Sequence, residues 1–111
     1  MNGMEIATAV NYKKQVVWIV ENNSGLGMVS HARRLLGLPY NTGAEFKRVD
    51  FLRIARGLGA QGIKITKPGE INRKMMDNIF ASGKPAVLDV RIDRGEVPPL
   101  FFRAKALEDY F

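Results

Sequence analysis

The sequence predicts an α/β fold, a partial doubly wound parallel sheet of about three strands with flanking helices. Apolar, strand-like runs occur at Val16 to Glu21, Gln61 to Thr66 and Ala86 to Ile92, and segments with helical spacing of apolar residues separate them. Strands separated in this way pair in parallel through right-handed crossovers. A polar turn that contains glycine follows the first run, at the place where ligands bind in such sheets.

The first helix is expected from Met4 to Tyr12, where Glu5 in the first turn suits the positive end of the helix dipole. The strand that follows is apolar on both faces, as a central parallel strand should be, and Trp18 is expected in the core. A whole sheet of this type has about five or six strands, so the expected sheet has an unfinished edge.

The second helix is expected from Leu26 to Leu36, ended by Gly37 and Pro39. Its only histidine, His31, is interpreted as a surface or hydrogen-bonded structural residue, not a catalytic one. The expected buried stripe is Met28, Val29, Ala32, Leu35 and Leu36. Residues 37–49 are expected to be irregular.

Asp50 is predicted to cap a helix from Phe51 to Leu58, with Phe51, Ile54, Ala55 and Leu58 buried. The next helix is expected to carry Pro68 in its first turn and Glu70 near its start. Its inward residues are expected to be Ile71, Met75, Met76, Ile79 and Phe80. Asp89 interrupts the last strand, which predicts a strand end or an edge facing polar groups.

The turn after the first strand contains Asn23, Ser24, Gly25 and Gly27. An amide oxygen is a hard, neutral ligand suited to Mg²⁺ or Ca²⁺, and glycines let a ligand approach the main chain. The start of the following helix offers free N–H groups to an anion. The same residue types are also common in turns that bind nothing, so both interpretations stay open at this point.

Three stretches of the chain carry a family resemblance: MNGMEIATAVNYKKQVVWIVENNSGLGMV, DFLRIARGLGAQGIKITKPGEI and SGKPAVLDVRIDRGEVPPL. Through them the chain resembles the C-terminal cofactor domain of thiamine-diphosphate enzymes, most closely the acetolactate synthase, pyruvate oxidase and benzoylformate decarboxylase group. The resemblance implies that the chain is the second half of that domain. It also implies that the Asn23 side chain and the Gly25 carbonyl bind Mg²⁺, which bridges to the diphosphate. The cofactor would then lie along Ser24, Gly25, Leu26, Gly27 and Met28.

The chain departs from the family pattern in one respect that matters for activity. The Gly-Asp-Gly triplet that carries the metal-binding aspartate is absent, and by the family's spacing it would precede Met1. We therefore expect a fragment, or a short reading frame derived from a longer enzyme that acts on 2-oxo acids by decarboxylation or carboligation. No residue matches the family's activating glutamate, so no catalytic residue is predicted and the isolated chain is expected to be inactive. His31 and Ala32 replace the Gln-Trp pair often found in acetolactate synthases.

Composition bounds the remaining alternatives. The 111 residues fit one domain over 1–99, followed by an aromatic tail at 100–111 that is expected to be helical and to pack on a partner. The positive charges that give the net charge of +6 are scattered along the chain, so nucleic acid is not expected as a partner. A small, non-enzymatic basic module that binds a partner or polyanion remains the alternative function.

Neither a cysteine nor a long apolar run occurs, which favours a cytoplasmic protein away from membranes. The open sheet edge predicts a homo-oligomer or association with the rest of a parent enzyme.

Overall fold

The computed structural model describes residues 3–38 and 43–96. The chain divides into two compact units. The first consists of Met1–Asn22 and Val49–Ile92, and the second of Asn23–Arg48 and Asp93–Phe111. The predicted tail at 100–111 lies outside the described residues, so the expectation for it stays a prediction.

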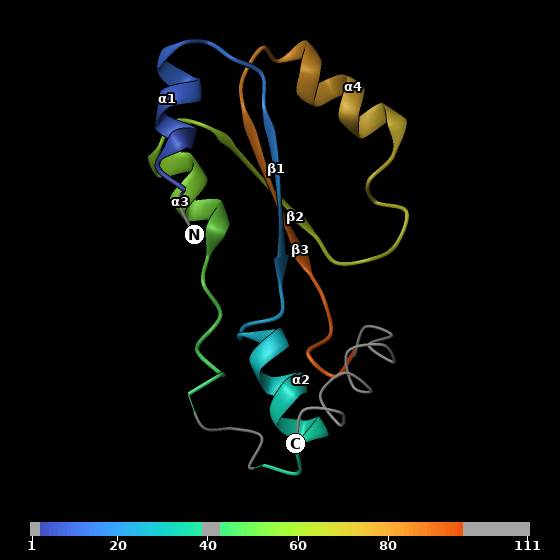
Figure 1. Cartoon of the computed structure of the whole chain (residues 1–111). Coiled ribbons are helices and arrows are strands. Elements are labelled where there is room, and N and C mark those ends of the chain that lie inside the picture. Colours follow the sequence, from blue (N-terminus) through green and yellow to red (C-terminus); the bar gives the residue numbers. More distant parts are fainter. Residues whose placement is uncertain (1–2, 39–42, 97–111) are drawn as a thin grey trace, which may run out of the picture. The chain divides into compact units, whose positions relative to one another are not determined.

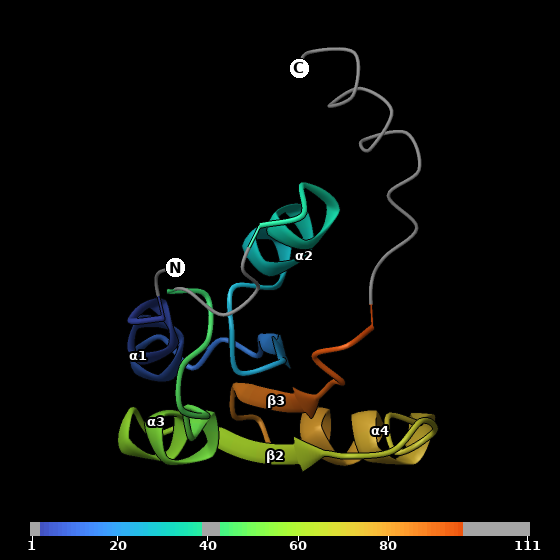
Figure 2. The ribbon, with the colours of Figure 1, turned by 90° about the horizontal axis from the view of Figure 1, so that it is seen from below.

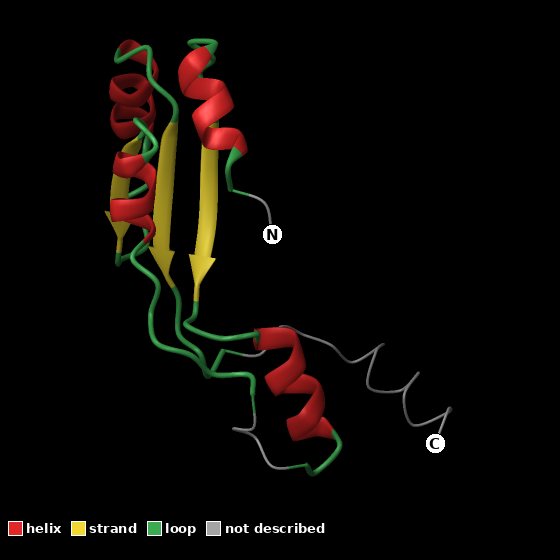
Figure 3. Cartoon of the chain, turned by 90° about the vertical axis from the view of Figure 1, so that its left-hand side faces the viewer, coloured by secondary structure: helices red, strands yellow, loops and turns green. Residues whose placement is uncertain are grey.

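The first unit is built on a parallel sheet of three strands, which confirms the predicted α/β fold (Figure 3). The strands are β1 (Val17–Asn22), β2 (Gln61–Ile65) and β3 (Ala86–Arg91), in the order β1-β3-β2. Each predicted strand is present, because the β-branched and aromatic residues in these runs suit a pleated, covered surface.

The positions of the strands within the sheet differ from two predictions. Among the described strands β1 lies at an edge and β3 in the middle, whereas the sequence predicted a central first strand. Asp89 lies inside β3 with none of its surface exposed, so it marks neither a strand end nor an edge. An apolar pattern reports whether the faces of a strand are covered and says nothing about its lateral neighbours. Asp89 is accommodated because Asn22 and Arg91 contact its carboxylate.

The helices α1 (Glu5–Asn11) and α3 (Phe51–Gly57) lie side by side on one face of this sheet (Figures 1 and 2). Their core cluster contains Ile6, Ala55, Ala60 and Val87, with Val10, Trp18, Val20, Phe51 and Leu58 packed against it. Trp18 therefore contributes to the core as predicted. Ile54 does not, because 45% of its surface is exposed on the outer side of the helix.

Helix α4 (Arg73–Ala81) covers the opposite face of the sheet (Figure 1). The cluster here contains Ile65, Ile79, Ala86 and Leu88, with Val17, Ile63, Met75, Met76 and Val90 packed against it. Two predicted inward residues are wrong: Ile71 precedes the helix and Phe80 lies on its outer side, with 40% and 47% of their surfaces exposed.

The start of α4 also differs from the prediction, because Pro68 and Glu70 belong to a turn ahead of the helix. The helix is capped by Asn72, whose side chain accepts a hydrogen bond from the Met75 N–H at 3.0 Å. The Glu70 carboxylate instead accepts from the backbone N–H groups of Thr66 and Lys67, at 2.7 and 3.3 Å. A carboxylate close to a helical pattern can therefore stabilise a preceding turn instead of the helix.

The second unit contains the helix α2 (Gly27–Leu35). Three residues of the predicted stripe are not buried, since Met28, Val29 and Leu36 are 65%, 45% and 48% exposed. The side that packs carries Ser30 and His31 instead, which are 1% and 6% exposed. His31 is thus neither a surface residue nor hydrogen-bonded through Nε2, for which the described residues provide no partner. No helix in the described part of the chain has the length and apolar character needed to cross a membrane.

Candidate functional site

The turn that begins the second unit has a left-handed residue at its centre. Ser24 has a φ of +58° and is 5% exposed. Such a backbone conformation is uncommon for a residue other than glycine and has to be held by its surroundings. Part of that support is local, since Asn23 Oδ1 accepts a hydrogen bond from the Gly25 N–H at 3.1 Å. The Asn23 amide thus faces the inside of the turn.

A second segment, 43–46, pairs with this turn through an antiparallel bridge between Gly25 and Glu45. The Leu26 N–H donates to the Ala44 carbonyl at 2.7 Å, and the Phe46 N–H donates to the Ser24 carbonyl at 3.2 Å. Because these two bonds flank Gly25, its own N–H and carbonyl point away from the paired segment. Among the described residues, none donates to the Gly25 carbonyl. That oxygen is therefore free to bind a ligand.

Close packing explains why the turn has glycine at positions 25 and 27. A Cβ on Gly25 would lie 2.8 Å from the Ala44 carbonyl oxygen, which the bridge fixes in place. A Cβ on Gly27 would lie 2.6 Å from Asn23 Nδ2 and 3.8 Å from His31 Cε1. Glycine at 27 thus lets the Asn23 side chain lie against the start of α2.

The start of α2 offers unpaired N–H groups. Its N-cap, Leu26, makes no side-chain capping bond, and the N–H groups of Gly27, Met28 and Val29 have no acceptor among the described residues. Free N–H groups at the positive end of a helix bind phosphate and other anions well. Beside them lie the Asn23 amide and the exposed side chains of Leu26 and Met28. The arrangement suits an anionic group attached to a less polar body.

Three charged residues that the sequence did not single out surround the turn. Arg94 Nε donates to the Asn23 carbonyl at 3.2 Å, and its Nη2 donates to the Ser24 carbonyl at 2.9 Å. Its Nη1 forms an ion pair with Glu45 at 2.9 Å. Arg48 Nε donates to Ser24 Oγ at 2.9 Å. No sequence signal could have found these residues, because each lies far from the turn in a segment without regular structure.

The oxygen donors in this unit fit a phosphate–metal group only in part. Asn23 Oδ1 retains a lone pair beside its bond to Gly25, and the Gly25 carbonyl is free, which gives two neutral donors. In the described ranges no group of three or more His, Cys, Asp or Glu side chains could hold a metal ion. Glu45 is the nearby carboxylate, and Arg94 neutralises it. Mg²⁺ is usually bound by one or two carboxylates together with phosphate oxygens. The turn and the start of α2 therefore fit a phosphate better than they fit the metal.

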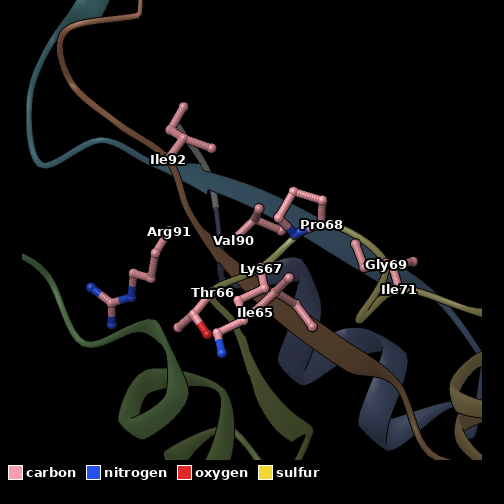
Figure 4. A pocket seen from close by; sticks show the side chains of 9 residues that line it. All are labelled: Ile65, Thr66, Lys67, Pro68, Gly69, Ile71, Val90, Arg91 and Ile92. Atoms are coloured by element: carbon pink, nitrogen blue, oxygen red, sulfur yellow. The ribbon is translucent and has the colours of Figure 1, made fainter.

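The first unit contains a pocket of about 250 Å³ (Figure 4). It is formed by residues 65–69 and 90–92 together with Ile71. Its walls are largely aliphatic, and none of the predicted cofactor residues lines it. Figure 4 shows the Arg91 side chain directed away from Pro68 and Ile71, so the guanidinium does not point into the pocket.

Comparison with known proteins identifies the kind of protein that this turn belongs to. The family described as thiamine pyrophosphate enzyme, C-terminal TPP binding domain, matches residues 1–90. The putative thiamine pyrophosphate-containing protein YdaP of Bacillus subtilis is 35% identical over 86% of this chain and 16% of its own length. The acetolactate synthase large subunit of Haemophilus influenzae is 32% identical over 98% of this chain and 19% of its own. A probable acetolactate synthase large subunit of Methanocaldococcus jannaschii is 33% identical, covering 90% and 17%. The chain thus spans less than a fifth of the length of these relatives.

Proposed function

This chain belongs to the thiamine pyrophosphate enzyme family, within the C-terminal TPP binding domain, and we propose from this premise that its turn 23–28 binds the diphosphate end of thiamine diphosphate. The observation that carries the proposal is the uncapped start of α2, where the N–H groups of residues 27–29 lack acceptors among the described residues. A diphosphate is the anion of this cofactor, and a helix N-terminus favours such an anion.

We further propose roles for the individual residues of the turn. Asn23 Oδ1 and the Gly25 carbonyl would bind the Mg²⁺ that accompanies the diphosphate. Ser24, Gly25, Leu26, Gly27 and Met28 would lie along the cofactor. The free Gly25 carbonyl supports this set, and so does the closeness of Asn23 to Gly27. The buried Ser24 would contribute by shaping the turn beside the cofactor, because its hydroxyl and carbonyl oxygens accept hydrogen bonds from Arg48 and Arg94.

The complete protein is proposed to act on 2-oxo acids by decarboxylation or carboligation, as a lyase or transferase of the acetolactate synthase type. Relatives that carry this name support the proposal. Thiamine diphosphate supplies a nucleophilic carbon and an electron sink, and the residues of this chain bind and orient it. We assign no catalytic role to any residue of this chain, and we expect the isolated chain to be inactive. The partner would be the remainder of the parent enzyme or a second copy of the chain, in the cytoplasm.

Titration of the ¹⁵N-labelled chain tests the turn as the site. Inorganic pyrophosphate and thiamine diphosphate, each with Mg²⁺, should shift the amide signals of Gly27, Met28 and Val29 most, with saturation only in the millimolar range. Calorimetry at micromolar cofactor should detect no binding, because the metal lacks its usual carboxylates. An Asn23→Ala variant should weaken the response, whereas Asn78→Ala, on the exposed side of α4, should not.

Two results would contradict the proposal. Shifts confined to the pocket residues 66–69, or no shifts at millimolar ligand, would show that the turn is not the phosphate site. Micromolar affinity would show that the two neutral oxygens suffice and that no further carboxylate is needed.

A further inference from the structure

We propose that Arg94, held by Glu45, is a positioning residue that keeps the turn 23–28 in its ligand-binding conformation before a ligand arrives. The inference rests on the proposed function of this turn. It adds a residue pair that lies outside the turn and outside α2. The pair is called the Arg94–Glu45 clamp below.

The clamp uses all three nitrogens of one guanidinium. Nε and Nη2 donate to the consecutive carbonyls of Asn23 and Ser24, at 3.2 and 2.9 Å. Nη1 lies 2.9 Å from Glu45 Oε2, and both side chains are about two-thirds buried, with exposed fractions of 35% and 31%. The planar fork of arginine therefore fixes two adjacent carbonyls relative to a carboxylate, which the single ammonium group of lysine cannot do.

The turn requires such support because of Ser24. A serine with a φ of +58° lies in a sparsely populated region, and neighbouring groups have to select it over the ordinary one. Arg94 and the Phe46 N–H both bind the Ser24 carbonyl, while Arg48 binds the hydroxyl. Glu45 links these contacts, since it is paired with Gly25 through its backbone and with Arg94 through its side chain.

The clamp also determines which oxygens remain for a ligand. It engages the carbonyls of Asn23 and Ser24, whereas the bridge leaves the Gly25 carbonyl pointing the other way. The groups left over are that carbonyl, the Asn23 amide oxygen and the N–H groups at the start of α2. Three of the five N–H groups of Arg94 are engaged by the Asn23 and Ser24 carbonyls and by Glu45, so this arginine acts on the turn through them.

The test compares the full-length chain with Arg94→Gln, Arg94→Lys and Glu45→Gln. The first readout needs no ligand: the intraresidue HN–Hα nuclear Overhauser effect of Ser24, which is strongest at positive φ, and the amide exchange of Leu26 report the conformation of the turn. The second is the pyrophosphate titration with Mg²⁺. Arg73→Gln is the matched control, because Arg73 also forms an ion pair, in its case with Asp77, but is 95% exposed.

We expect Arg94→Gln and Arg94→Lys to weaken the intraresidue HN–Hα effect of Ser24, to speed the exchange of Leu26 and to weaken pyrophosphate binding about tenfold. Glu45→Gln should have a smaller effect in the same direction, and Arg73→Gln none. An unchanged HN–Hα effect at Ser24 in Arg94→Gln would overturn the clamp, as would full rescue of this effect and of binding by lysine. If wild type binds no pyrophosphate while Arg94→Gln loosens the turn, the clamp stands and the proposed function fails.

Discussion

Asp89 Oδ1 accepts a hydrogen bond at 2.9 Å from Asn22 Nδ2, which joins the middle of the central strand to the last residue of β1. Asn22 Nδ2 also donates to the Val49 carbonyl at 3.1 Å. The other carboxylate oxygen of Asp89 lies 2.7 Å from Arg91 Nη2. Asp89 is fully buried and the Arg91 side chain is 16% exposed, so one carboxylate organises polar groups at the carboxyl end of the sheet. This end precedes the proposed site in the chain, because Asn23 follows directly.

Replacing Asp89 by asparagine should therefore be costly. The amide oxygen can still accept from Asn22, but the charge that pairs with Arg91 is lost and a buried guanidinium remains. Removing one partner of a buried pair typically destabilises a protein by about 3 kcal/mol. Urea unfolding followed by circular dichroism measures the change.

Asp77→Asn is the control for Asp89→Asn, because Asp77 pairs with Arg73 at the surface, where both side chains are largely exposed. Its loss should cost less than about 0.5 kcal/mol. Equal costs for the two variants would show that the buried network contributes no more than an ordinary surface pair.

Gly27→Ala should separate ligand binding from stability. The new Cβ would meet Asn23 Nδ2 at 2.6 Å, so the flexible amide would have to move away from its bond with Gly25. Alanine also favours the helix, so the free energy of unfolding should change by less than about 1 kcal/mol. The pyrophosphate response should nevertheless fall strongly, and the titration described above measures it.

Gly57→Ala provides the comparison for Gly27→Ala, since Gly57 ends α3 and a Cβ there meets nothing within 4 Å. This variant should gain roughly 0.5 kcal/mol and bind pyrophosphate as wild type does. Undiminished binding by Gly27→Ala would argue against a role for the placement of Asn23.

The sequence predicted the fold well where local chemistry decides the outcome. The three apolar runs became strands, and Asp50 caps α3 by accepting from the Arg53 N–H. It predicted the lateral order of the strands poorly, because pairing partners are distant in the chain and a covered face looks the same in a central and an edge strand. Asp89 illustrates this, since its partner Asn22 is 67 residues away in the chain and could not be anticipated from the strand pattern.

The candidate site was predictable in its centre and not in its surroundings. The two glycines and Asn23 were visible as a turn between a strand and a helix, and the described turn brings them together. Arg94 and Glu45 were not visible, because they belong to irregular segments and act on backbone carbonyls. The position of Glu70 at the start of a helix was predicted wrongly for a related reason: a carboxylate can bind any nearby N–H group that points outward.

Self-association is expected through the open edge of β1. Among the described strands β1 has only β3 as a neighbour, and Ile19 is 58% exposed on it. Apolar surface left in water costs about 25 cal/mol per Å², and the predicted aromatic tail would add more such surface. We expect a dimer or larger species in sedimentation at several concentrations, weakened by Ile19→Lys and by a chain that ends at Pro99.

The prediction of self-association is tested most sharply by the shortened chain. If a chain without residues 100–111 associates as strongly as the full one, the tail is not part of the contact. If the full chain is a monomer that stays in solution, an open edge and an aromatic tail together are insufficient to drive association.

The turn ahead of α4 should lose stability in acid through Glu70. The backbone N–H groups of Thr66 and then Lys67 stabilise its carboxylate and lower the pKa below the ordinary value of 4.5. Because the pKa is depressed in the folded state, the stabilisation is fully present above pH 4.5 and is lost as the pH falls through the lower pKa of the folded state.

The amide proton shifts of Thr66 and Lys67, followed from neutral pH downward, should therefore titrate together with a midpoint below 4.5. Glu70→Gln should abolish this titration, whereas Glu21→Gln, which removes one exposed carboxylate from β1, should leave it intact. A midpoint at or above 4.5 would contradict the hydrogen bonds described for this turn.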